Sequence, residues 1–183
     1  MSFAWTTHRF AGGALALDVA NSVILRGDEA QSLDRFSVPE QIESFCEAAI
    51  ELSAERECFG LLQPPPPQQQ MTLIDLREAT DRYFRSTIMN GREDDLLLAN
   101  LLQACSTALR NNMQAESLAA ATAHSVLRLI HGPDRERIRI CGNCGWLFID
   151  RSKNRSRIWC DMTVCGNRQK AARHYRRKKE NAS

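Results

Sequence analysis

The sequence predicts a mainly α-helical body with short N-terminal strands, followed by a small C-terminal module built around four cysteines. Apolar residues recur at helical spacing over much of residues 39–130. The charge also changes sign along the chain. Residues 1–134 contain 10 Lys or Arg and 18 Asp or Glu, a net charge of −8, whereas residues 135–183 contain 14 and 4, a net charge of +10. We therefore predict an acidic domain over 1–134 and a basic module over 135–183.

Composition limits the class of protein. A chain of 183 residues with 43% hydrophobic content can form one ordinary domain and a small module. It has no apolar run approaching the length of a membrane span, so no membrane partner is expected. The first ten residues lack the layout of a signal peptide, which favours a reducing cytoplasm for the seven cysteines.

The N-terminal part begins with an apolar stretch over residues 11–25. Its alternation predicts one or two short strands around residues 14–25, followed by a polar loop over 26–35. Asp18 and Asn21 interrupt the apolar run. Their side chains either hold the backbone at a strand end or line a ligand pocket, and the first is favoured because Asx side chains readily bond nearby backbone.

Four helices are predicted after this stretch. The first follows residues 37–40, which resemble a capping box with proline in the first turn. The others span about residues 72–89, with Thr72 as the cap, 93–109 and 117–130. Four prolines at 64–67 predict a stiff surface loop, because they cannot continue a helix. Four glutamates on the outer side of the first helix are expected to face solvent: Glu43, Glu47, Glu51 and Glu55.

The four C-terminal cysteines have the spacing of a zinc site. They are Cys141, Cys144, Cys160 and Cys165, a C-x2-C pair and a C-x4-C pair separated by fifteen residues. Four protein ligands leave no open position, so one structural zinc ion is predicted. A disulfide framework needs an oxidising compartment. A redox C-x-x-C pair usually begins a helix after a strand, whereas here the pair is followed by a strand-like segment at 146–149.

The segment WCDMTVCGNRQKA, preceded by CGNCGWLFIDRSKNRSR, resembles the CGNR-type zinc finger. The family is named after the tetrad that stands here as Cys165, Gly166, Asn167 and Arg168. In that family the finger follows an N-terminal ABATE domain, described as a stress-induced transcription regulator. The resemblance implies zinc at the four cysteines and DNA binding by the finger.

The N-terminal part resembles the family more loosely. Residues 17–22 are similar to the start of the family's first domain, with serine in place of the usual threonine, and Arg77 and Asn100 stand where the family has an arginine and an asparagine. Arg77 is then a candidate partner of Asp18. Four residues are candidates for lining a ligand pocket. Alternatively, their side chains bond the backbone and have only a structural role: Asp18, Asn21, Arg77 and Asn100.

The module is predicted to be treble-clef-like, with a knuckle, a β-hairpin and a helix. The knuckle is the C-x2-C turn, residues 146–149 and 157–159 form the hairpin, and the helix runs from Cys165 to about residue 179. We expect Ala171, Ala172 and Tyr175 to pack on the hairpin. Three residues are expected to support the metal ligands by shaping the turn or bonding a carbonyl or thiolate: Gly166, Asn167 and Arg168.

Concentrated positive charge in the module favours a polyanionic partner. The candidate nucleic-acid-binding residues lie in the hairpin turn and on the helix: Arg151, Lys153, Arg155, Lys170, Arg173, His174, Arg176 and Arg177. We therefore predict a zinc-finger DNA-binding protein, a bacterial transcription regulator whose N-terminal domain senses a small-molecule effector or forms a homodimer. The alternatives are an RNA-binding protein, an adaptor for an acidic protein, and a small-molecule binder. The sequence has no catalytic motif that we recognise, so no enzyme is predicted.

Overall fold

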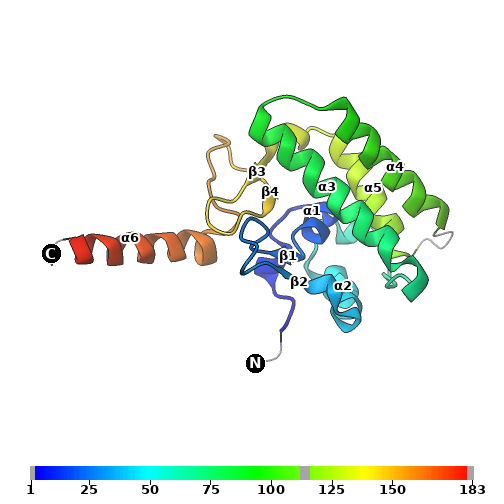
Figure 1. The fold of residues 1–183 in the computed structure, drawn as a ribbon, viewed down its shortest axis with the longest axis horizontal. Coiled ribbons are helices and arrows are strands. Elements are labelled where there is room, and N and C mark those ends of the chain that lie inside the picture. Colours follow the sequence, from blue (N-terminus) through cyan, green and yellow to red (C-terminus); the bar gives the residue numbers. More distant parts are fainter. Residues whose placement is uncertain (1–2, 112–115, 181–183) are drawn as a thin grey trace.

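A computed structural model describes residues 3–111 and 116–180, and it confirms the mainly helical prediction (Figure 1). Three helices lie side by side: α3 (Gln70–Asn90), α4 (Asp95–Asn111) and α5 (Leu118–His131). The short helix α1 (Leu15–Ala20) packs against α3 and α5, and α2 (Pro39–Leu52) adds Ile42, Phe45 and Ala49 to the same core. Short 3-10 helices connect these elements at Thr7–Phe10, Arg35–Ser37, Arg56–Cys58, Pro67–Gln69 and Arg135–Arg137.

The prediction of strands over residues 14–25 is wrong for most of that stretch. Residues Leu15–Ala20 form α1, and only Val23–Ile24 is a strand, β1, which pairs antiparallel with β2 (Leu33–Asp34) inside the predicted polar loop. Every residue of α1 is buried. A short, fully buried apolar run has no polar face, so its pattern does not separate helix from strand.

Helix ends agree with the prediction only in part. Pro39 occupies the first turn of α2, but the Ser37 hydroxyl donates to the Asp34 carbonyl oxygen (2.8 Å) and does not cap the helix. Helix α3 begins before Thr72, so that residue is not its cap. The helix ends at Asn90, and the residue after it, Gly91, has a φ of 64°, which suits glycine. Ser117 caps α5 by accepting from the Ala120 N–H.

One of the four glutamates predicted to face solvent points inward. Glu43, Glu47 and Glu51 are exposed, as expected. Glu55 follows α2, and its carboxylate accepts hydrogen bonds from the Leu15 N–H (2.8 Å) and from Arg128 Nε (2.9 Å). It therefore connects the start of α1 to α5.

The second sheet differs from the predicted hairpin. Strand β3 (Ile138–Ile140) pairs antiparallel with β4 (Leu147–Ile149), so residues 157–159 are not the partner of β4. The carboxylate of buried Asp150 accepts from the Ser152 N–H (2.9 Å) and the Arg157 N–H (2.8 Å), which closes the segment after β4 into a loop. The knuckle between β3 and β4 is thus itself the hairpin turn.

The hydrophobic core continues from the helices into this second sheet. Ile138, Leu147 and Ile149 pack in the main core, and the Ile149 N–H donates to the Gly12 carbonyl oxygen (2.9 Å). Phe148 packs on the opposite side of β4, with the cysteines. The main hydrophobic core therefore contains residues from both sides of residue 134. The division into two domains at that point stays a prediction.

Helix α6 (Asn167–Glu180) extends away from the rest of the molecule (Figure 1). Residues 171–179 are all exposed, and Tyr175 is 71% exposed. The prediction that Ala171, Ala172 and Tyr175 pack on the hairpin is therefore wrong. The physical reason is that all three residues of β4 are already buried, which leaves that strand no apolar face for α6.

Within residues 3–111 and 116–180, no helix combines the length and the apolar character that crossing a bilayer requires.

Candidate metal centre and basic helix

The four predicted cysteine ligands meet at one point. Their sulfur atoms all lie within 4.8 Å of one another, and two Sγ–Sγ distances, Cys144 to Cys160 and Cys160 to Cys165, are 3.7 Å. A tetrahedral zinc ion with Zn–S bonds of about 2.3 Å requires sulfurs about 3.8 Å apart. The geometry therefore fits four thiolates around one zinc ion.

The electrostatics of the cluster also call for a cation. Hydrogen bonds from the Cys144 and Cys160 thiols lower the pKa of Cys141, so one thiolate forms readily. The hydrogen bonds to Cys141 raise the pKa of Cys160 and bring that of Cys144 to about 12. Cys141, Cys144 and Cys160 thus resist ionising together by themselves, whereas a divalent ion compensates the charge of their thiolates.

Local backbone geometry positions each pair of ligands. In the knuckle, the Cys141 N–H donates to the Trp146 carbonyl oxygen (2.8 Å) and Gly145 has φ of 73°, which suits glycine. The second pair lies at a π-helical turn, Met162–Gly166. Asp161 caps that turn by accepting from the Thr163 N–H (2.7 Å). These turns aim both pairs of sulfurs at one centre.

Two residues that the sequence interpretation missed support the ligands. Asn143 Nδ2 donates to Cys165 Sγ (3.3 Å), and Gln169 Nε2 donates to Asn143 Oδ1 (3.0 Å). The sequence places Asn143 inside the C-x2-C turn and Gln169 inside the predicted helix, without a signal that they meet. Together they connect the knuckle to the first turn of α6, and such hydrogen bonds orient and tune a metal site.

The predicted supporting residues lie nearby with different roles. The Gly166 N–H donates to the Asp161 carbonyl oxygen (3.1 Å), and Asn167 Nδ2 donates to the Thr163 carbonyl oxygen (2.9 Å), so both shape the turn. Arg168 is exposed and has no hydrogen bond to a sulfur or carbonyl in the described part of the chain. Its contribution to the metal site stays a prediction.

The N-terminal segment contributes a histidine to the cluster. His8 Nδ1 lies 3.1 Å from Asp161 Oδ2, its Nε2 lies 3.9 Å from Cys165 Sγ, and its ring lies against Trp146. The buried Trp146 ring in turn donates through Nε1 to the Val23 carbonyl oxygen (3.2 Å). A lone histidine far from the cysteines carries no sequence signal for this contact.

The candidate ligand-pocket residues mostly have structural partners. Asp18 is fully buried, and its Oδ1 accepts from the Gly12 N–H (2.9 Å), whereas Oδ2 has no partner. Burial raises the pKa of Asp18 well above its usual value. Asn21 bonds both the N–H and the carbonyl oxygen of Leu147, each at 2.9 Å. Asp18 and Asn21 therefore hold backbone segments together.

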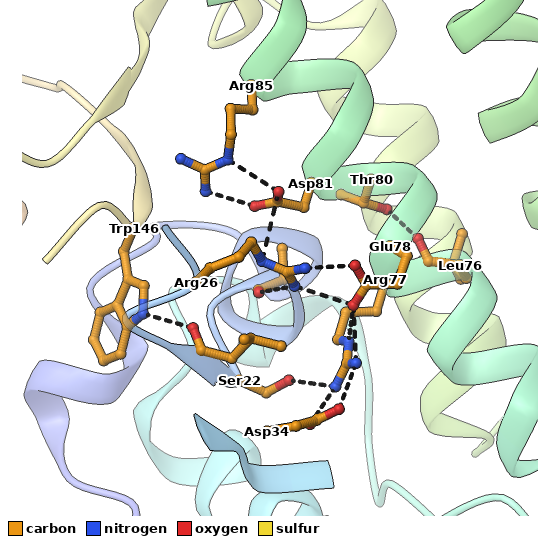
Figure 2. Close-up of polar contacts among 12 residues, drawn as sticks. Ser22, Arg26, Asp34, Leu76, Arg77, Glu78, Thr80, Asp81, Arg85 and Trp146 are labelled. Carbon is orange, nitrogen blue, oxygen red and sulfur yellow. Dashed lines mark hydrogen bonds and ion pairs between the residues drawn. The ribbon is translucent and has the colours of Figure 1, made fainter. Parts of the chain in front are cut away.

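Arg77 and Asn100 complete that set. The Arg77 guanidinium donates to both carboxylate oxygens of Asp34 (2.6 and 2.7 Å), so its partner is Asp34 and not Asp18 (Figure 2). Although burial raises the pKa of Asp34, the hydrogen bonds from Arg77 lower it overall. Asn100 is exposed on α4. Asn100 lines two hollows beside α3 and α4, and neither of them is lined by Asp18, Asn21 or Arg77.

The basic candidates fall into two groups. In the loop after β4, Arg151 donates to the Gly13 carbonyl oxygen (3.0 Å) and pairs with Asp134 (3.1 Å), and Arg155 pairs with Glu136 (3.6 Å). Lys153 is exposed without an ion pair among the described residues. The other candidates project from α6, exposed and without ion pairs to any described acidic group: Lys170, Arg173, His174, Arg176 and Arg177.

Comparison with known proteins agrees with this geometry. No curated protein matches the chain. The family model of the CGNR zinc finger matches residues 137–178, which include β3, β4, both cysteine pairs and most of α6. Residues 137–178 are therefore similar to the CGNR zinc finger, and the match together with the four clustered cysteines supports one structural zinc ion.

Proposed function

We propose that this protein binds duplex DNA through α6 and regulates transcription. The observation that carries the proposal is a basic helix that extends from the molecule with residues 171–179 exposed (Figure 1). Six of its Lys and Arg residues have no ion pair within the described ranges: Arg168, Lys170, Arg173, Arg176, Arg177 and Lys178. A helix of this kind offers its charge to an external polyanion.

The arrangement of charge around α6 favours a groove over a flat surface. At 3.6 residues per turn, these six side chains leave no angular gap wider than about 80° around the helix. A helix lying on a membrane, or packing on a protein, needs an apolar face. The B-DNA major groove is about 12 Å wide and accepts an α-helix between two rows of phosphates, whereas the A-form RNA major groove is too narrow. This favours duplex DNA over duplex RNA.

Charge on the rest of the chain supports the same orientation. Residues 1–134 carry a net charge of −8, so phosphates repel them, while residues 135–183 carry +10. Steering by such an asymmetric field presents α6 to the nucleic acid. In this proposal the N-terminal part supplies the regulatory function, by sensing an effector or by forming a homodimer.

Binding of the zinc-loaded protein to a labelled duplex across a salt series tests the proposal. Replacing Arg173 and Arg177 by alanine should reduce the slope of log K against log salt by about 2, because each lost phosphate contact contributes about 0.9. The matched control replaces two exposed arginines elsewhere, Arg92 and Arg110, and should leave the slope unchanged.

Two outcomes would reject DNA binding by α6. One is no binding to the duplex even at low salt, and the other is equal loss in the two double variants. Duplex RNA and polyglutamate at matched charge serve as competitors, and stronger competition by either would favour the RNA-binding or the adaptor alternative. Enrichment of particular genomic fragments by the same preparation would support a regulator of specific genes.

A further inference from the structure

We propose that a cavity beside the knuckle binds a small organic monoanion and that Arg85 couples this site to the zinc finger. The cavity has a volume of about 390 Å³ and lies along α3, between Arg26, Glu78 and Met89. Small-molecule sites typically occupy about 300–1,000 Å³. The regulatory consequence rests on the proposed DNA binding, whereas the site and its coupling to the finger do not.

The charge of the lining predicts the charge of the ligand. Two carboxylates, Glu78 and Asp81, face three guanidinium groups. Arg26 pairs with both carboxylates and Arg85 pairs with Asp81 (2.7 Å). Arg82 is exposed and, among residues 3–111 and 116–180, has no ion pair. The lining of the cavity thus has one positive charge in excess. A ligand with a single carboxylate would balance this charge by forming a bidentate ion pair with Arg82.

The rest of the wall favours an organic ligand over an inorganic ion. Met89 lies at the edge of the cavity, 72% exposed, and the arginine side chains present their aliphatic carbons. Ser86 and Asn90 line the same end, and Asn90 Nδ2 donates to Ser86 Oγ (3.0 Å). A carboxylate near Arg82 with a small apolar body toward Met89 satisfies both ends of the cavity.

Arg85 connects the cavity to the knuckle. Its Nε and Nη2 donate to Asp81 (3.0 and 2.7 Å), while its Nη1 donates to the Gly145 carbonyl oxygen (2.9 Å). Figure 2 shows the contacts between Arg85 and Asp81, with Arg26 and Trp146 nearby. Gly145 directly follows the ligand Cys144. An anion that attracts the Arg85 guanidinium therefore changes the hydrogen bond that supports the knuckle.

The connection continues to α6. The knuckle residue Asn143 donates to Cys165 Sγ (3.3 Å) and accepts from Gln169 in the first turn of α6 (3.0 Å). Arg85, residues 143–145 and Gln169 thus form a continuous chain of contacts from the cavity to the base of α6. If a ligand changes DNA affinity through this chain, DNA must change ligand affinity by the same factor.

Ligand-observed NMR titration of the full zinc-loaded chain with benzoate and its neutral isostere benzamide tests the site. Benzoate should bind with a Kd on the order of 1 mM, and benzamide should bind at least about tenfold more weakly, because it cannot pair with arginine as an anion. Arg82→Ala should weaken benzoate binding by about tenfold, while the control Arg56→Ala should not. Equal binding of the two compounds, absence of saturable benzoate binding, or equal behaviour of the two variants would overturn the site.

The rate of zinc transfer to a chelator tests the coupling without DNA. Benzoate should change this rate in the unmodified protein. The variant Arg85→Lys keeps a positive charge beside Asp81. It lacks the planar guanidinium, whose separate N–H groups donate to Asp81 and to the Gly145 carbonyl oxygen at the same time. Benzoate should still bind to it but should no longer change the rate, and a preserved effect would overturn the coupling. A benzoate effect on zinc transfer in a protein that binds no DNA would support this site while rejecting the proposed function.

Discussion

Replacing Asn21 by alanine should destabilise the protein although Asn21 touches neither the metal ligands nor α6. The Asn21 amide is 3% exposed and bonds the N–H and the carbonyl oxygen of Leu147 in β4. Leu147 is fully buried, so alanine leaves both backbone groups without partners. Each unsatisfied buried group costs about 1–3 kcal/mol, so the free energy of unfolding should fall by roughly 2–6 kcal/mol.

Urea denaturation of the zinc-loaded protein at fixed free zinc measures this loss as a lower midpoint at unchanged m value. The matched control is Asn100→Ala, the other asparagine of the predicted ligand pocket, which is exposed on α4 and should change stability by less than about 0.5 kcal/mol. Equal effects of the two substitutions would refute the structural role of Asn21. A small effect in Asn21→Ala alone would mean that water or another group replaces the lost hydrogen bonds.

Two further predictions concern the metal and a buried acid. Cys160→Ser should abolish stoichiometric zinc binding, measured by a colorimetric assay, because it removes one of four ligands, whereas Cys58→Ser, at an exposed cysteine, should retain zinc; zinc retention in the first variant would contradict the site. Burial raises the pKa of Asp18, so its stabilising contribution is complete below the unfolded pKa of about 3.9 and is lost as pH rises through the folded pKa. As the pH rises from about 5 to about 8, the stability of Asp18→Asn should therefore fall less than that of the unmodified protein, and parallel urea midpoints in both proteins would contradict this.

Features that depend on local pattern could be predicted from the sequence. The spacing of the four cysteines is enough to predict the zinc site, because two close pairs can supply the four ligands of a tetrahedral ion. Helices α3 and α5 likewise follow from one-sided apolar periodicity and from end signals such as Gly91 and Ser117. In each case the residues that carry the signal lie close together in the sequence.

Features that depend on contacts between distant segments could not be predicted. Helix α1 was interpreted as a strand because every residue is buried, so no polar face reveals its period. The partner of β4 was misassigned because β3 and residues 157–159 are both short, alternating segments, and only the closed loop at Asp150 distinguishes them. The contact of His8 with Cys165 spans nearly the whole chain and leaves no trace in the spacing of residues.

The position of α6 follows from how this finger obtains its stability. Among the described residues, the hydrophobic cluster at the candidate metal centre has five buried members: Cys141, Trp146, Phe148, Cys160 and Cys165. Such a cluster is too small for an independent core, and zinc binding can add on the order of 10 kcal/mol. The sheet gains the rest from the helical body, since Ile138, Leu147 and Ile149 pack there.

All three residues of β4 are buried, so that strand offers α6 no face to pack on, and the helix extends away from the finger. Its base is held by Gln169 and Asn143, and residues 170–179 are exposed. In the proposed function, a helix held at its base enters the groove between two rows of phosphates without losing contacts to its own fold. Under the proposal, a ligand-induced change at the knuckle would act on the base of α6 through Asn143 and Gln169, which is the reason for placing the coupling at the Arg85 contact.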